Sequence, residues 1–236
     1  MDVRQGLTRI EPPGILCPAR ARPEHVGAPA YSGGVTSELQ RVSVSTGADA
    51  STTVVIERNF DVSPEVLWGA LTEPEQLKLW APHTADRVLD SFGPATLVML
   101  ADGNGDDQEV LIEVLVVKPP HLLKYTWGVD VLRWEITADV TPDGLEALLG
   151  DVNPAGGDDE GTGSVLVLRH TLGDVSMVSA VAAGWQLCFD VLETVLAGHP
   201  EAPKRGANAL EYGWAELNER FADELGVKPS VVFPPE

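Results

Sequence analysis

One stretch near the end of the chain, residues 178–198, constrains the fold more than any other. It reads V-S-A-V-A-A-G-W-Q-L-C-F-D-V-L-E-T-V-L-A-G and contains no proline. Apolar residues recur in it at steps of three and four, which places them along one side of a helix, and polar residues follow the same steps on the opposite side. The apolar side is formed by Val181, Trp185, Cys188, Leu192 and Val195. The stretch therefore predicts a long amphipathic helix that must bury one side.

The segments before this helix are typical of β-strands. Thr53–Phe60 is the first predicted strand, and two short helices follow it, one capped by Ser63 and one with a capping box of Thr72 and Glu75. Six further strands are predicted at residues 87–92, 95–100, 108–117, 122–127, 131–140 and 164–171. An antiparallel sheet that covers the apolar side of the long helix makes a two-layer α+β domain.

The chain divides into three parts. Residues 1–52 are rich in Pro, Gly, Ser, Ala and Arg without helical or strand period, which predicts a disordered N-terminal extension, with a docking tail as the functional alternative. Residues 53–198 form the predicted domain, and an acidic insertion at 141–163 is expected to be a solvated loop. Residues 199–236 contain a further predicted helix, Ala207–Leu225, which is expected to pack on the domain.

Charge and cysteine content exclude several classes of function. The formal net charge is −20, and residues 1–52 carry equal numbers of acidic and basic residues, so the whole excess lies on the folded part. Such a surface repels nucleic acid and anionic membranes, and we expect neither as a partner. Cys17 and Cys188 are too few and too far apart for a disulfide framework or a metal site, and a cytoplasmic location fits them. No motif predicts a metal or another cofactor.

The order of predicted elements resembles the START-like superfamily, also called the SRPBCC or helix-grip fold. Within it, Val55–Trp80 (V-I-E-R-N-F-D-V-S-P-E-V-L-W-G-A-L-T-E-P-E-Q-L-K-L-W) and Gly184–Leu192 are similar to the family named after the activator of the heat-shock-protein-90 ATPase. The resemblance implies a curved antiparallel sheet wrapped around a long C-terminal helix, two short helices after the first strand and an extra C-terminal helix. It implies no catalytic residue, because proteins of this fold include ligand carriers, polyketide aromatase/cyclases and co-chaperone modules.

Strand alternation predicts which side chains face the long helix. Charged residues mark the outer side of each strand, so neighbouring aromatic residues should point inward. Together with aromatic residues from the helices, they predict an apolar interior that either binds a small molecule or is solid core. The candidate ligand-binding residues are Trp68, Trp80, Tyr125, Trp127, Trp134, His170, Trp185 and Phe189.

Three polar residues and one acidic segment complete the candidates. His170 and His83 are the histidines near the interior, and a hydrogen-bonded core histidine is a more economical interpretation of each than a general base. By strand alternation Arg58 falls on the inward side of its strand. We expect its long side chain to extend outward at the strand end, and the alternative is an inward contact with an acidic ligand group. Asp102, Asn104, Asp106 and Glu113 match positions of a calcium loop that lacks its glycine, so a hairpin turn is favoured.

These features favour a domain that binds a small hydrophobic molecule, aromatic or polyketide-like, in an internal cavity. The enzymatic alternative is an aromatase/cyclase in which His170, Tyr125 or His83 moves protons over a bound polyketide. A third alternative is a co-chaperone-like interaction module that uses its outer surface, and a protein partner or a homodimer stays open. A filled interior favours the interaction module, whereas an open apolar one favours the ligand binder.

Overall fold

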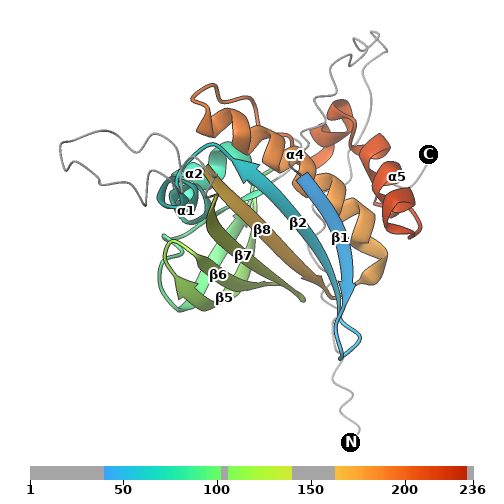
Figure 1. Cartoon of the computed structure of the whole chain (residues 1–236), viewed down its shortest axis with the longest axis horizontal. Coiled ribbons are helices and arrows are strands. Elements are labelled where there is room, and N and C mark those ends of the chain that lie inside the picture. Colours follow the sequence, from blue (N-terminus) through green and yellow to red (C-terminus); the bar gives the residue numbers. More distant parts are fainter. Residues whose placement is uncertain (1–39, 102–105, 140–162, 233–236) are drawn as a thin grey trace, which may run out of the picture.

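The computed structural model describes residues 40–101, 106–139 and 163–232 (Figure 1). Residues 141–162 of the acidic insertion lie outside these ranges, and so do Asp102 and Asn104. The elements in chain order are β1 (Gln40–Thr46), β2 (Thr52–Phe60), α1 (Pro64–Thr72), α2 (Pro74–Trp80), β3 (His83–Ala85), β4 (Gly93–Met99), β5 (Gln108–Lys118), β6 (Leu122–Trp127), β7 (Asp130–Asp139), β8 (Gly163–Leu172), η1 (Val175–Met177), α4 (Val178–Leu196), η2 (Gly206–Tyr212) and α5 (Trp214–Leu225).

All of the strands belong to one antiparallel sheet in the order β1-β2-β8-β7-β6-β5-β4-β3. The sheet curves around α4, while α1 and α2 lie at one end and α5 at the other (Figure 1). Inward residues of the strands and of α4 form a continuous buried core. The predicted α+β helix-grip architecture is confirmed, including the two short helices after the strand that begins at Thr52.

Strand β1 corrects the predicted extent of the disordered N-terminal extension. Gln40–Thr46 pairs along its whole length with β2, and its alternate residues Val42 and Val44 pack against the core. The sequence R-V-S-V-S has the period of two that a half-buried strand requires, although its serines made it resemble the polar stretch before it. The prediction was therefore wrong for residues 40–52, and residues 1–39 lie outside the described ranges.

The region between α1 and β4 differs from the prediction in two details. The expected strand at 87–92 is a loop held by Arg87, which donates hydrogen bonds to the carbonyl oxygens of Val88, Ser91, Gly93 and Pro94. The strand of this region is instead β3. The expected capping box also fails, because Thr72 ends α1 and donates its hydroxyl to Trp68 O, whereas Glu73 begins α2 without a side-chain cap.

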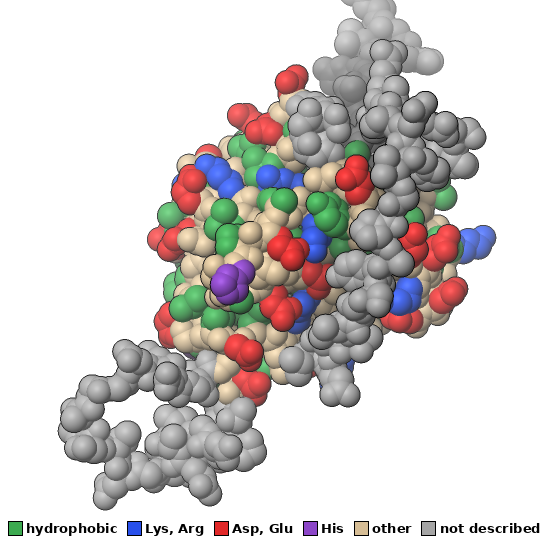
Figure 2. All heavy atoms as spheres, turned by 90° about the horizontal axis from the view of Figure 1, so that it is seen from above, with side chains coloured by type: hydrophobic (Ala, Val, Ile, Leu, Met, Phe, Trp, Pro, Cys, Tyr) green, Lys and Arg blue, Asp and Glu red, His purple; other side chains and the backbone are tan. Residues whose placement is uncertain are grey.

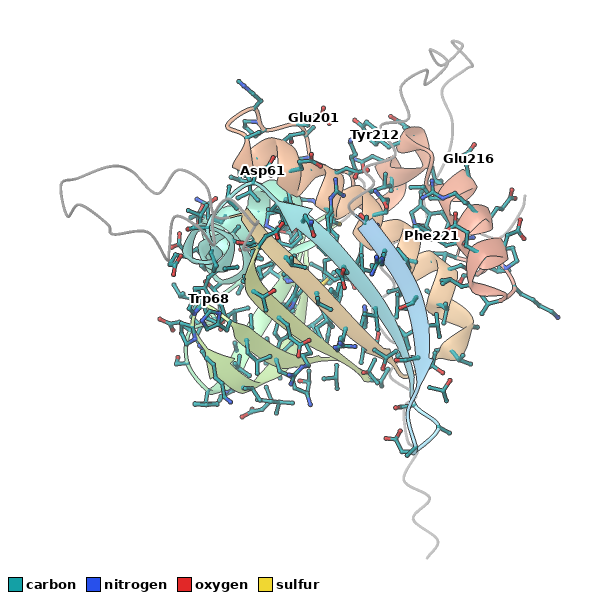
Figure 3. All side chains as sticks on the ribbon, in the orientation of Figure 1. Asp61, Trp68, Glu201, Tyr212, Glu216 and Phe221 are labelled. Carbon is teal, nitrogen blue, oxygen red and sulfur yellow. The ribbon has the colours of Figure 1, made fainter. Side chains whose placement is uncertain are left out.

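Helix α4 is buried around most of its circumference. The predicted apolar side faces the sheet, and α5 covers part of the remainder through Trp214 and Phe221, which points toward α4 (Figure 3). Residues 175–196 are long and apolar enough to cross a membrane by length and composition, with 72% of the apolar window buried inside the domain. Because a helix buried between two layers carries apolar residues around most of its circumference, this composition is explained by packing.

The C-terminal residues are fixed to the domain by a polar network. The predicted helix at 207–225 is divided at Gly213, whose φ of 80° allows the chain to pass from η2 into α5. Beyond α5, Ser230 exchanges hydrogen bonds with Ser179 on α4 and receives one from Asn218 Nδ2 on α5. These bonds join the C-terminal segment to α4 and α5.

Candidate functional site

The interior between the sheet and α4 contains a cluster of aromatic rings in direct contact. Strands β6 and β7 supply Tyr125, Trp127 and Trp134 because alternate residues of a strand point to the same side. Helix α4 supplies Trp185 and Phe189, which are one turn apart on the same side of the helix. Ring centroids are separated by 5.2 Å for Trp134–Trp185, 6.0 Å for Trp127–Trp185 and 6.4 Å for Trp80–Trp185.

The cluster brings together seven of the eight predicted ligand-binding residues: Trp80, Tyr125, Trp127, Trp134, His170, Trp185 and Phe189. Each of these side chains is buried. Trp185 touches Trp127 and Trp134 directly, so these rings do not face each other across an open space. The eighth residue, Trp68, is half-buried on α1 and packs against the edge of the core (Figure 3).

His170 has a partner for each ring nitrogen. Trp185 Nε1–H donates to Nδ1 at 3.0 Å, and since the indole nitrogen is only a donor, Nδ1 must carry a lone pair. The imidazole proton therefore lies on Nε2, which donates to the Asp130 carboxylate at 2.9 Å. Asp130 also accepts the backbone N–H of Gly173. The chain Asp130–His170–Trp185 joins the β6–β7 turn, β8 and α4, and it leaves His170 no nitrogen for a ligand.

His83 differs from His170 in having neither nitrogen paired. It lies on the edge strand β3 with 1% of its surface exposed, and Nδ1 and Nε2 are both without a hydrogen-bond partner. The neighbouring Trp127 Nε1 is also buried and unpartnered. The two ring centroids are 5.4 Å apart, and Tyr125 lies 6.5 Å from His83. Three unpaired nitrogens thus gather at one end of the cluster, which we call the His83 end.

Burial controls the ionisation of the groups at the His83 end. It lowers the pKa of His83 to about 3, with a smaller contribution from the positive charge of Arg205. It also raises the pKa of the Tyr125 hydroxyl well above its usual range and that of the Cys188 thiol to about 12. All three side chains are therefore uncharged near neutral pH.

Arg58 points inward, contrary to the favoured expectation. Only 4% of its side chain is exposed, and its guanidinium pairs with Asp190 at 2.7 Å and with Glu193, both on α4. A buried guanidinium needs such partners, because an unpaired charge in the interior is strongly unfavourable. The sequence placed Asp190 and Glu193 on the polar side of the helix but did not indicate that Arg58 would reach them. These bonds join β2 to α4 and satisfy Arg58 without an acidic ligand.

A concave feature lies outside the aromatic cluster. A groove of about 320 Å³ runs between α1 and the end of α4, lined by Glu65, Val66, Gly69, Ala70, Glu73, Gln76, Val195 and Leu196. On the face shown in Figure 2, acidic side chains are interspersed with basic and apolar ones. Within residues 40–101, 106–139 and 163–232, no group of three or more His, Cys, Asp or Glu side chains is placed to hold a metal ion.

Comparisons with known proteins agree with this architecture. Residues 61–150 match the family model described as activator of Hsp90 ATPase homolog 1-like protein. This range covers α1 to β7 and the first part of the acidic insertion, and it includes three of the clustered tryptophans, Trp80, Trp127 and Trp134. A comparison with curated protein sequences finds no significant match.

Two solved structures share the fold at low sequence identity. A conserved protein of unknown function from Enterococcus faecalis has a TM-score of 0.52 at 15% identity, covering 78% of this chain and 91% of its own. A protein from Bordetella parapertussis has a TM-score of 0.51 at 16% identity, covering 75% and 87% respectively. The curved sheet, the long helix and these two structures show that this protein has the START-like (helix-grip) fold, and its residues 61–150 are similar to the activator of Hsp90 ATPase homolog 1-like family.

Proposed function

We propose that the domain binds a small aromatic molecule at the His83 end of the ring cluster. The observation that carries this proposal is the group of three unpartnered nitrogens on His83 and Trp127. A buried polar group without a hydrogen bond costs about 1–3 kcal/mol, so native proteins keep few of them. A ligand that supplies the missing hydrogen bonds would offset this cost, and the surrounding rings would contact its apolar part.

The position of His83 supports a route by which a ligand reaches the rings. Strand β3 has three residues, lies at the edge of the sheet and pairs with β4 alone. Short edge segments with few hydrogen bonds open at a lower free energy than central strands. Opening of β3 would separate His83 from Trp127 and make room for a planar molecule between them.

Binding is favoured over catalysis by the ionisation of the candidate proton-transfer groups. An efficient general acid or base has a pKa close to the working pH. The pKa of His83 is about 3 and that of Tyr125 is raised, while both nitrogens of His170 are already bonded. These three groups were the candidates for an aromatase/cyclase, and their pairing or their uncharged state makes each a poor proton-transfer group.

A protein-interaction role is the second candidate, favoured by the outer surface of the sheet. Leu111 on β5 is 81% exposed on the outer side of the sheet, where an antiparallel sheet usually carries polar residues, and Phe92 in the loop before β4 is 66% exposed. The direct contacts among the interior rings also suit a module that uses its surface. This candidate becomes the leading one if the interior binds no aromatic molecule.

Titration with Nile red, an uncharged apolar dye, tests the proposal. We expect saturable binding with one dye per chain, quenching of tryptophan emission and a change of at least fivefold in Kd in Trp127→Leu. Trp68→Leu is the matched control, because it removes a tryptophan outside the ring cluster. The control should bind within about twofold of the wild type.

Absence of saturable binding, or equal affinity in both variants, contradicts the proposal. Far-ultraviolet circular dichroism checks that each variant is folded. If Trp127→Leu does not fold, Trp127→Phe keeps an aromatic ring while removing the unpaired N–H, and a Kd unchanged in that variant counts against the proposed location.

A further inference from the structure

The unpaired nitrogens at the His83 end specify which hydrogen-bonding groups a ligand must supply. An indole N–H is only a donor, whereas a neutral imidazole has one donor nitrogen and one acceptor nitrogen. The His83 end therefore offers two donors and one acceptor. A hydroxyl group both donates and accepts, so it can pair with either kind. A carboxylate only accepts, and it would leave the acceptor nitrogen of His83 unpaired.

One positive charge near His83 could attract an anion. Arg205 is the charged group that acts on His83, and its Nη1 already donates to the carbonyl oxygens of Lys78 and Ala81 at 3.1 and 2.9 Å. Tyr125 on β6 is uncharged, and so is Cys188 on α4, which also interacts with Arg205. The far side of Trp127 stacks on His170, whose nitrogens are both occupied. Because Nη1 of Arg205 is already bonded to these carbonyl oxygens, a buried carboxylate beside His83 would exchange its hydration mainly for the donors of His83 and Trp127.

We infer that His83 and Trp127 form an uncharged polar subsite that selects a hydroxyl-bearing aromatic ligand over its carboxylate counterpart. This inference rests on the proposed binding function and adds the chemistry of the ligand to it. His83 is the specificity-determining residue, because it alone combines a donor with an acceptor. Trp127 supplies the second donor and an apolar face.

Three ligands with the same ring system test this selectivity: naphthalene, 2-naphthol and 2-naphthoate. Isothermal titration calorimetry at pH 7 should give a Kd for 2-naphthol about tenfold lower than that for naphthalene, since one well-formed buried hydrogen bond is worth about a factor of ten. 2-Naphthoate should bind at least tenfold more weakly than 2-naphthol. His83→Leu should remove most of the preference for the hydroxyl while changing the Kd of naphthalene by less than about threefold.

Matched variants distinguish the contribution of the subsite to the hydroxyl preference from effects that any His→Leu substitution could have on ligand affinity. His199→Leu makes the same substitution at an exposed histidine and should keep the full hydroxyl preference. Trp127→Phe should reduce the preference in part, because it removes one of the two donors. If His83→Leu does not fold, the preference in Trp127→Phe decides the question, and a preference equal to that of the wild type overturns the inference.

The outcomes distinguish this inference from the proposed function. If neither naphthalene nor 2-naphthol binds, the proposed function itself fails. If naphthalene binds and the hydroxyl adds no affinity, or if the preference survives in His83→Leu, only the selectivity is overturned. Tightest binding by 2-naphthoate that is lost in Arg205→Met would also overturn it and would assign the polar subsite to Arg205.

Discussion

Two histidines lie in the same aromatic interior with the same 1% exposure, and they have opposite hydrogen-bonding environments. His170 on the central strand β8 has both nitrogens paired, to Asp130 and Trp185. His83 on the edge strand β3 has neither paired. Both rings contact Trp127, at centroid distances of 5.7 and 5.4 Å. Burial and aromatic surroundings are therefore shared, and only the completeness of the hydrogen bonds differs.

This difference separates a structural role from a candidate binding role. A fully paired buried histidine specifies one arrangement of the elements that it joins, because every alternative arrangement leaves polar groups unpaired. An unpaired histidine lowers the stability of the free protein, which suits a site whose missing partner is a ligand. The same substitution at the two positions should then have effects of opposite sign.

The largest effect is expected for His170→Leu. This variant leaves Trp185 Nε1–H without an acceptor and deprives the Asp130 carboxylate of its Nε2–H donor. The free energy of unfolding should fall by about 3 kcal/mol, since two polar groups lose partners in or near the core. Urea unfolding followed by tryptophan fluorescence measures it. A loss below about 1 kcal/mol would show that the Asp130–His170–Trp185 chain contributes little to stability.

The next largest effect is the pH dependence of stability that arises from His83. Its pKa is about 3 in the folded protein and about 6.5 in the unfolded chain, so between these values only the unfolded chain binds the proton. This contribution to stability is fully present above pH 6.5 and is lost progressively as the pH falls toward 3. Between pH 7 and pH 5, the wild type should lose about 2 kcal/mol more than His83→Leu does. Equal losses in the two proteins would show that His83 becomes protonated in the folded state.

The sequence predicted the fold well because the fold depends on the regular spacing of hydrophobic residues along the strands and the long helix. The inward residues Tyr125, Trp134 and Leu168 and the apolar side of α4 follow from alternation and helical spacing, and each is buried. The failures occur where a local polar group changes the outcome. Arg87 holds residues 87–92 as a loop through bonds to carbonyl oxygens, and serines concealed the alternation of β1.

The sequence predicted most of the residues that form the candidate site, but not which of their polar atoms form hydrogen bonds. Strand parity predicted that His170 points inward, whereas His83 lay outside the predicted strands and was only expected near the interior. A hydrogen-bonded core histidine was the correct interpretation for His170 alone. The distinction depends on Asp130, which lies 40 residues from His170 in the chain and meets it only through the pairing of β7 with β8. Arg58 reaches Asp190 and Glu193 across 132 and 135 residues of sequence. Long-range polar contacts of this kind leave no periodic signal, so the sequence could not reveal which polar groups remain unpaired.

The smallest expected change in the free energy of unfolding is the most decisive for the comparison of His83 with His170, because it is a gain in stability. His83→Leu replaces an unpaired polar ring with an apolar side chain of similar volume, and it removes the cost of burying the imidazole nitrogens. At pH 7 the free energy of unfolding should rise by about 1 kcal/mol, whereas most substitutions of buried residues lower it. His83→Gln keeps polar atoms at the same place and should show no such gain. Urea unfolding with an unchanged m-value measures both variants. A loss of more than about 1 kcal/mol in His83→Leu would mean that His83 is held by a structural partner, and the contrast with His170 would then no longer mark a binding site.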